Sequence, residues 1–499
     1  MKRVFIKELS AYSVEGLRAV LRVSHERAMQ CIDILTTRGV LRLRSGSDED
    51  DYDSDLTEAY KGKYQFSYVG LTIIGDGSQD GEGLSIIVYP KYMDERDFSN
   101  NCPSLKSMEK LRQVFRVLRK CQGSYSDIAT LTESSKRFND RIACILMLVE
   151  MYAEYGEYSN FIKTLRINGS GDISWERTIA LHQPAVQDGV PVYFECETIA
   201  NTRDEADFIT RLHRCILTEC SKYLRSSGVS EILGLEEIEI SDESLCDLGD
   251  LDHLLYRLDR ERNVQYVTWK QDTIDLMKRY VSKEEMSIDS DEVICLGTNS
   301  FYHVWEQACK VALGDLLCTP IGNIGISLSA RWKPYRSKKL IDIIPSPQWQ
   351  VCKDGEYRKC GDVATLIPDT IAIWADSDGK STFGIFDAKY YTPHLGTQVH
   401  GVPGVESVTK QILYQSAYRQ FILDHDFDNV VNTFLVPNDG AEFELMGCVE
   451  FPGVFPTEGL PFASGVSMWK LPAERVWQCY LNGEKLSCDR LSTLFHVVL

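Results

Sequence analysis

The chain has 499 residues, of which 43% are hydrophobic and 25% charged, and its formal net charge is −19. This composition excludes a long disordered, collagen-like or low-complexity chain, and the length predicts several domains rather than a single core. The negative charge excludes DNA binding through a uniformly basic surface. Residues 300–425 nevertheless carry 13 basic against 12 acidic residues, which leaves room for a local basic channel.

We expect the protein to be neither membrane-bound nor extracellular. The N-terminal MKRVFIKELSAYSVEG has no continuous apolar stretch of a secretory signal, and the longest apolar run, residues 142–149, is eight residues long. We therefore predict a cytoplasmic protein with no membrane partner. The 16 cysteines include no CxxC pair, so we expect no zinc site. We expect the thiols to be reduced, and several of them to lie in cores, such as Cys31, Cys144 and Cys309.

The first 62 residues predict a small unit of two helices and a strand. Residues 13–22 and 24–38 show helical spacing, with Ser24 as N-cap and Gly39 as a stop, and residues 40–43 are strand-like. On the second helix one face collects the apolar positions Ala28, Cys31, Ile32 and Leu35. This order is typical of a winged helix. The exposed side chains of His25, Arg27 and Gln30 would then be available to contact a DNA groove.

A different use of this N-terminal unit fits the same pattern. A small helical dock for a partner protein would also explain two short helices and a strand. The acidic run DEDDYDSDLTE at 48–58 favours that alternative, because seven acids without a base repel a polyanion. What the unit binds stays open at this point.

The middle of the chain predicts a hairpin followed by helices. Residues 64–74 and 84–89 are strand-like and are joined by the glycine-rich GDGSQDGEG, which indicates a hairpin with a mobile tip and lacks GxGxxG spacing. Helical patterns cover 103–163, 204–224 and 243–281, whereas 171–184 and 190–198 are strand-like. We interpret residues 63–282 as a β-hairpin plus an α-rich connecting or partner-binding region.

The chemistry-bearing segment begins at Ile367. IPDTIAIW predicts a strand, ADSDGK a turn and STFGIFDAKYY a second strand, and together they bring Asp369, Asp387 and Lys389 into one hairpin. Asp387 and Lys389 lie two residues apart and therefore point to the same face. Two carboxylates and an ammonium suit a hard divalent cation that activates water against a phosphodiester. A surface hairpin with an ordinary charge pair is the alternative.

Two predicted helices flank this hairpin in the sequence. Residues 301–315 carry Glu306, an acid that could reach a metal ion directly or through water, or simply be solvated. Residues 405–421 carry Lys410 and Gln411, which could contact the phosphate backbone or the attacking water. An ordinary amphipathic helix explains the second pattern nearly as well.

A basic segment precedes the hairpin. The sequence ARWKPYRSKK at 330–339 holds five basic and two aromatic residues in ten positions. Such a segment is suited to contact phosphates, with aromatic rings that stack or pack nearby, and a solvated loop is the alternative. Together with Lys410, its candidate DNA-binding residues are Arg331, Trp332, Lys333, Arg336, Lys338 and Lys339.

At these residues the chain resembles a known family. The FxxVWE helix at 301–306, the Pro368-Asp369 strand, the DAKYY strand at 387–391 and the KQxxY helix at 410–414 resemble the PD-(D/E)xK nuclease domain of LlaJI-type restriction endonucleases. That domain is in turn similar to the McrC nuclease subunit of Mcr-type systems. The resemblance extends to YQFSYVG and IIVYPKY within residues 64–92 and to GDISWERTI at 171–179.

The resemblance implies a fold, an activity and partners. The fold is a multidomain α+β and α/β protein with a winged-helix-like N-terminal unit, an α-rich middle and a restriction-endonuclease-like domain at 283–499, whose mixed central sheet is flanked by helices. The activity is Mg²⁺-dependent, with Mn²⁺ as an alternative ion, and cuts double-stranded DNA in anti-phage defence. The implied site is Glu306, Asp369, Asp387 and Lys389, with Gln411 as an adjunct; the metal ligands are Glu306, Asp369 and Asp387.

The resemblance also implies a separate motor, an AAA+ GTPase subunit similar to McrB, within a homo- or hetero-oligomer. The sequence agrees with a motor on another chain. Its GKS string at 379–381 has Trp374 where a Walker A motif requires glycine, so we expect no nucleotide site. Alternatives are an accessory protein that binds DNA or an NTPase and uses its nuclease fold as a platform, and a transcription regulator that reads DNA through residues 1–75.

Overall fold

A computed structural model describes residues 2–44, 62–75, 83–122, 140–284, 293–353, 355–361, 364–451 and 465–495. The acidic run at 48–58 and the glycine-rich tip predicted after residue 75 lie outside these ranges. The chain divides into two compact units. The helical unit comprises Met1, Ile74–Gly83 and Lys136–Ile294, and the sheet unit comprises Lys2–Ile73, Leu84–Ser135 and Cys295–Leu499. The predicted boundaries after residues 62 and 282 stay predictions.

The core of the helical unit consists of packed helices, and it confirms the helices predicted near 204–224 and 243–281. Asp207 and Asp250 start two of them by accepting N-terminal backbone N–H groups at 2.9 Å. One of the longer helices, α12, packs against both α6 and α11. The helices are α6 (Asp140–Tyr155), α8 (Phe208–Ser226), α9 (Val229–Leu233), α10 (Leu245–Leu248), α11 (Leu251–Val264) and α12 (Thr268–Glu284).

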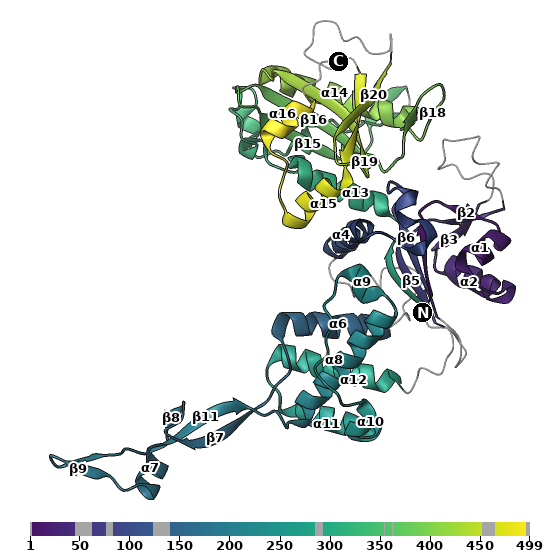
Figure 1. The fold of residues 1–499 in the computed structure, drawn as a ribbon. Helices are drawn as coiled ribbons and strands as arrows, with labels where there is room; N and C mark the ends of the chain where they lie inside the picture. The colour runs from purple at the N-terminus through teal and green to yellow at the C-terminus, as the bar shows by residue number, and fades with distance from the viewer. Residues whose placement is uncertain are drawn as a thin grey trace. The chain divides into compact units, whose positions relative to one another are not determined.

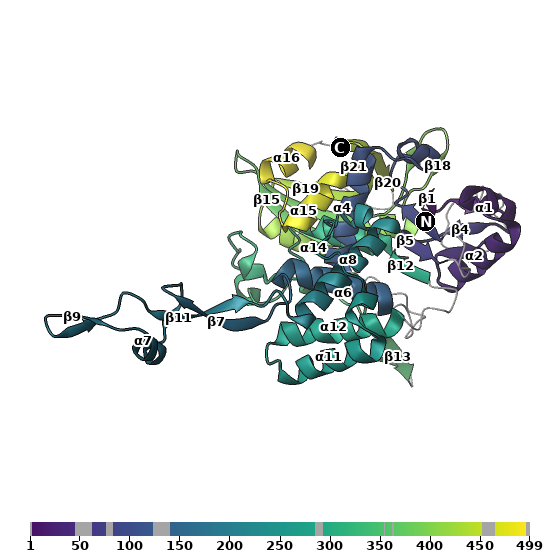
Figure 2. The ribbon, with the colours of Figure 1, turned by 60° about the horizontal axis from the view of Figure 1, so that its bottom comes forward.

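An arm, defined as residues 161–203, projects from the helices of this unit (Figure 1 and Figure 2). Its sheet has the order β7-β11-β8, and its far part is a hairpin of β9 and β10 with a short helix, α7. The bounds are β7 (Phe161–Ile167), β8 (Asp172–Ile173), α7 (Trp175–Leu181), β9 (Ala185–Gln187), β10 (Val190–Val192) and β11 (Glu197–Arg203).

The strand expected over 171–184 is wrong for most of its length, because α7 occupies Trp175–Leu181. Trp175 and Ile179 are four residues apart, a spacing that fits a helix as well as the alternation of a strand. A tertiary contact favours the helix: the Thr178 hydroxyl, on the buried face of α7, accepts the Glu197 N–H at 2.9 Å. The second predicted segment, 190–198, is divided between β10 and the beginning of β11.

The N-terminal part of the sheet unit confirms the two predicted helices. Ser24 caps α2 by accepting the Arg27 N–H at 3.2 Å, and the predicted apolar face of α2 is buried. A three-stranded sheet of order β2-β4-β3 accompanies the helices. The bounds are β2 (Ala11–Tyr12), α1 (Val14–Leu21), α2 (His25–Thr37), β3 (Leu41–Leu43) and β4 (Tyr64–Phe66). Its winged-helix assignment stays a prediction.

A second sheet, of order β1-β6-β5-β12, corrects the continuous strand expected over 64–74. That segment breaks at Ser67 and Tyr68, so its two halves join different sheets. Gly70 allows β5 to approach β12 closely, because a Cβ there would lie 2.3 Å from the Leu296 carbonyl oxygen. The strands are β1 (Lys2–Lys7), β5 (Val69–Ile74), β6 (Leu84–Tyr89) and β12 (Val293–Thr298).

The C-terminal part of the sheet unit is a mixed five-stranded sheet of order β15-β16-β19-β21-β20. The central strands β16, β19 and β21 are parallel, and the two edge strands are antiparallel to their neighbours. The strands are β15 (Thr370–Ala375), β16 (Ser381–Ala388), β19 (Asn429–Asn438), β20 (Glu444–Glu450) and β21 (Gly465–Pro472); the accompanying helices are α13 (Phe301–Leu313), α14 (Val405–Asp424), α15 (Ala473–Asn482) and α16 (Cys488–Phe495).

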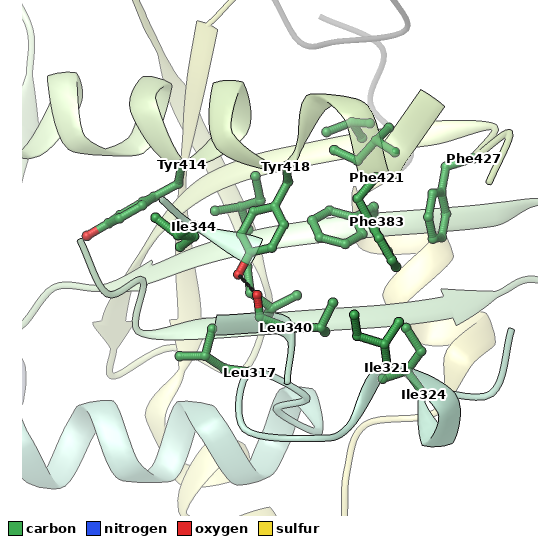
Figure 3. Packing of buried hydrophobic residues seen from close by; sticks show 14 residues of the cluster. Leu317, Ile321, Ile324, Leu340, Ile344, Phe383, Tyr414, Tyr418, Phe421 and Phe427 are labelled. Carbon is green, nitrogen blue, oxygen red and sulfur yellow. Dashed lines mark hydrogen bonds between the residues drawn. The ribbon is translucent and has the colours of Figure 1, made fainter. Parts of the chain in front are cut away.

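An apolar core lies between α14 and this sheet (Figure 3). Phe383 of β16 contacts the rings of Tyr418 and Phe421 on α14, and the buried Tyr418 hydroxyl donates to the Leu340 carbonyl at 3.1 Å. Aromatic side chains of this size contribute much of a core's burial energy. The core therefore fixes α14 over the strands that carry Asp369 and Asp387.

Residues before the helical unit belong to the same compact unit as the C-terminal sheet. Helix α4 (Leu105–Gln122) bonds to α15: the Gln113 side chain donates to the Glu474 carbonyl and Lys120 to the Tyr480 carbonyl, at 2.8 and 2.7 Å. The sheet unit is thus assembled from segments on both sides of the helical unit. Within the described ranges, no helix has the length and hydropathy that crossing a bilayer requires. Cys31, Cys144 and Cys309 are buried, as expected.

Candidate active site

The hairpin of β15 and β16 places Asp369 and Asp387 side by side. Strand register pairs Thr370 with Phe386, so the two aspartates meet at the open end of the hairpin. The Ala388 N–H donates to the Asp369 carboxylate at 2.9 Å and fixes it against β16. The predicted hairpin is confirmed, and the GKS string lies at its opposite, turn end, where Gly379 has φ +81°.

Burial makes this pair of carboxylates electrostatically costly. Asp387 is 6% exposed. Burial raises the pKa of Asp369 well above its usual range, and the contact with and charge of Asp387, followed by the charge of Glu306, raise it further. Two adjacent carboxylates cannot both be ionised cheaply in a poorly solvated site. The pair is therefore suited to share either a proton or a cation.

Lys389 completes the cluster that the sequence predicted. Its ammonium lies 3.0 Å from an Asp387 carboxylate oxygen, on the same face of the strand. Burial acts to lower the pKa of Lys389, but the charge and hydrogen bond of Asp387, with Asp369 behind it, raise the pKa above its ordinary value. The lysine is thus held protonated as a local positive charge beside the two carboxylates.

Glu306 lies close enough to act on this cluster electrostatically but has partners of its own. It is on α13, whose predicted helix is confirmed. Its carboxylate pairs with Lys310 at 2.6 Å and with His303 at 3.5 Å. Its charge contributes to the raised pKa values of Asp369 and Cys309. Its role as a metal ligand stays a prediction.

Helix α14, also confirmed, passes next to the cluster. The charges of Asp387 and Asp369 add to burial in raising the pKa of Tyr414. Gln411 lies one turn earlier on the same helix and is fully buried, and among the described residues neither amide atom of its side chain has a hydrogen-bond partner. A buried, unsatisfied amide is costly unless a bound group completes its bonding. Lys410 is paired with Glu406 at 2.5 Å.

The basic segment at 330–339 is exposed except for Trp332 and Leu340 beyond it. Trp332 packs edge-on against Phe421, and its indole N–H donates to Asp424 at 2.8 Å, so this ring anchors the segment to α14. Arg331 also approaches Asp424, at 3.7 Å. The remaining candidate DNA-binding residues, Lys333, Arg336, Lys338 and Lys339, are exposed. Contact of the segment with DNA stays a prediction.

The carboxylates of the cluster are the donors available to a divalent cation. Within the described ranges, no group of three His, Cys, Asp or Glu side chains has the arrangement to hold a metal ion. Asp369 and Asp387 nevertheless offer hard oxygen donors, the type that Mg²⁺ prefers, and Mg²⁺ commonly uses only one or two carboxylates together with water and phosphate. After burial, the negative charges of Asp387 and Glu306 help to raise the pKa of Asp369, and a cation would offset these charges. This pair fits Mg²⁺.

Comparison with known proteins identifies the chain. A profile of the LlaJI restriction endonuclease family matches residues 79–318 and 335–458. The chain belongs to the LlaJI restriction endonuclease family. It is also 27% identical over 450 residues to the Type II restriction enzyme BsuMI component YdjA of Bacillus subtilis (strain 168), covering 87% of this chain and 85% of that protein. The predicted family resemblance is confirmed, and with it a role in a restriction system.

The LlaJI family match includes the candidate site, but one contact that sequence reasoning missed involves a residue outside the matched ranges. Tyr390, next to Lys389, bonds to Glu8 at the end of β1. The two residues are 382 positions apart, and a lone glutamate after a short strand gives no local signal of such a bond. The exposed apolar surface of the arm was also missed, because β7 begins inside the segment 103–163 that was predicted helical and α7 was predicted as strand.

Proposed function

We propose that this LlaJI family member is the Mg²⁺-dependent endonuclease subunit of a restriction system and hydrolyses phosphodiester bonds of double-stranded DNA. The observation that carries the proposal is the convergence of Asp369, Asp387 and Lys389 at the end of the β15–β16 hairpin. In this role, Asp369 and Asp387 hold the cation. Mn²⁺ would serve as a substitute because it accepts the same oxygen ligands.

Each residue of the cluster has a chemical role under this proposal. Bound Mg²⁺ would neutralise developing phosphate charge and lower the pKa of a coordinated water. Lys389 offers a fixed positive charge to the scissile phosphate, while Asp387 orients its ammonium. Gln411 offers an unsatisfied buried amide to water or phosphate. Glu306 acts as an outer-sphere carboxylate, which contacts the metal ion through water. The exposed basic residues at 333–339 contact the DNA backbone.

The proposal is tested by plasmid cleavage. The purified chain, alone and with a candidate GTPase from an adjacent gene, is incubated with supercoiled plasmid. We expect nicked and linear DNA with Mg²⁺ or Mn²⁺ and intact plasmid with EDTA. An accessory protein without catalytic activity would give no cleavage under any of these conditions, and cleavage in EDTA would exclude a metal-dependent mechanism.

We further propose that an AAA+ GTPase subunit binds the arm. The BsuMI protein is named a component of its enzyme, which supports partner subunits in this system too. The arm carries a series of large apolar side chains that are each more than 40% exposed, a surface typical of a protein interface. They are Phe161, Ile162, Leu165, Ile167, Ile173, Trp175, Ile179, Leu181, Val186, Val190 and Phe194.

Serine in place of Phe194, which is 77% exposed, is expected to weaken binding of the GTPase by about tenfold or more, because truncation of an aromatic hot-spot residue at an interface costs about 2 kcal/mol or more. Tyr266→Ser is the matched control, since Tyr266 is 90% exposed in the same unit but outside the arm. Titration calorimetry with the purified GTPase measures both. Equal affinities for the two variants would exclude the arm as the binding surface.

A further inference from the structure

Tyr390 links the candidate catalytic strand to the N-terminal strands of the sheet unit. It directly follows Lys389, where β16 has ended, and it is 6% exposed. Because side chains alternate along an extended backbone, Tyr390 points away from the face that carries Asp387 and Lys389. Its ring lies 5.2 Å from that of Phe301 and 6.4 Å from that of Tyr92.

The Tyr390 hydroxyl ends in a small polar cluster formed by two parallel strands. β1 and β6 pair in parallel, so Glu8 and Lys91 both follow the C-terminal ends of neighbouring strands. The hydroxyl donates a hydrogen bond to the Glu8 carboxylate at 2.5 Å. The Lys91 backbone N–H donates both to the hydroxyl, at 3.2 Å, and to the same carboxylate oxygen, at 3.0 Å. The Lys91 ammonium lies 4.6 Å from the centre of the Tyr390 ring.

The backbone on the other side of Lys389 is held as well. Its N–H donates to the Leu435 carbonyl of β19 at 2.8 Å, and the indole of Trp305 donates to the same carbonyl at 3.1 Å. The backbone of Lys389 is therefore held on its N-terminal side by the hydrogen bond to β19 and on its C-terminal side by Tyr390. These contacts and the ion pair with Asp387 hold the residue, which lies just past the end of the regular strand at Ala388.

We propose that Tyr390 is a positioning residue, which Glu8 holds in place so that the Lys389 ammonium stays against Asp387. This inference rests on the proposed nuclease function. It gives the N-terminal part of the sheet unit a role in cleavage, since Glu8 directly follows β1. A hydrogen bond to a carboxylate is among the stronger ones in proteins, and this one is partly buried, so that solvent competes with it less than at the surface.

The electrostatics of Glu8 agree with an anchored carboxyl. Burial raises the pKa of Glu8, against the charge of Lys91 and the hydrogen bonds from Tyr390 and the Lys91 N–H. A desolvated carboxyl that accepts hydrogen bonds from both Tyr390 and the Lys91 N–H is held in one position. Loss of the tyrosine hydroxyl leaves the Glu8 carboxyl with fewer hydrogen-bond partners. Substitution of either Tyr390 or Glu8 should therefore lower the rate of cleavage.

The test is steady-state plasmid cleavage with Mg²⁺ and, where cleavage requires it, the GTPase partner. Tyr390→Phe removes the hydroxyl and keeps the ring, and we expect kcat to fall about tenfold to a hundredfold, as for other residues that orient catalytic groups, with an unchanged KM for DNA. Glu8→Ala should match this loss, and Glu8→Gln, which keeps an acceptor, should restore most of the rate. The double variant Glu8→Ala/Tyr390→Phe should be no slower than either single one.

Tyr418→Phe is the matched control, because it removes another buried tyrosine hydroxyl, with a single carbonyl acceptor, from the same unit. It should lower thermal stability, by less than Tyr390→Phe because its acceptor is a neutral carbonyl, and leave kcat unchanged. Wild-type kcat in Tyr390→Phe, or additive losses in the double variant, would overturn the inference. If Tyr390→Phe does not fold, Glu8→Ala decides the question in the same way. Cleavage by Asp387→Ala would instead refute the proposed nuclease function itself.

Discussion

Alanine in place of Asp387 is expected to lower the cleavage rate at least about a thousandfold, to the background of the plasmid assay. The side chain is 6% exposed and contacts both Asp369 and Lys389, so its loss removes a proposed metal ligand and releases the ammonium. Charge stabilisation by a catalytic metal ion amounts to several kcal/mol, and each 1.36 kcal/mol is about a tenfold change in rate.

The control for this variant lies in the same hairpin. Asp378→Ala removes an exposed carboxylate at the turn between β15 and β16, away from the open end that carries the cluster. It should cut plasmid at the wild-type rate. Comparable cleavage by Asp387→Ala and the wild type, with both proteins folded by circular dichroism, would remove the cluster from the mechanism.

Asparagine in place of Asp387 is expected to raise the stability of the metal-free protein and to abolish its stabilisation by Mg²⁺. One buried carboxylate of a repelling pair is neutralised, a change of the kind that commonly gains about 1 kcal/mol at functional sites. In the wild type, Mg²⁺ at a hundred times its Kd should add about 2.7 kcal/mol, because it binds only the folded chain.

The pH dependence of this effect has a definite sign. The folded pKa of Asp369 is raised above the unfolded value, so in EDTA this group stabilises the fold at low pH and loses that contribution as the pH rises through the folded pKa. The advantage of Asp387→Asn over the wild type should therefore grow with pH when metal is absent. Denaturation in urea at several pH values, with EDTA or Mg²⁺, measures it. A constant difference, or equal Mg²⁺ stabilisation of both proteins, would contradict the expectation.

The candidate site was predictable because its signals are local. Strand alternation places Asp387 and Lys389 on one face, and the turn residues at 376–380 fold the chain back so that Asp369 meets them. The capped helix after Ser24 followed from equally local spacing. In each case the residues that decide the structure are within about twenty positions of one another.

The features that sequence reasoning missed depend on contacts between distant segments. The bond from Tyr390 to Glu8 joins residues that are 382 positions apart, and the sheet β1-β6-β5-β12 combines strands that precede and follow the helical unit in the sequence. Helix α7 was predicted as strand because Trp175–Leu181 fits both periods and a contact of Thr178 with β11 decides between them. Tertiary contacts of this kind override local propensity.

The proposed nuclease function requires that Asp369 and Asp387 together bind a divalent cation beside Lys389. A crystal of the chain grown with Mn²⁺ and a short DNA duplex, with data collected at the manganese absorption edge, tests it most directly. We predict an anomalous peak about 2 Å from an oxygen of each aspartate, next to a phosphate that Lys389 contacts. A map with DNA bound at this hairpin but no anomalous density between the two carboxylates would contradict it.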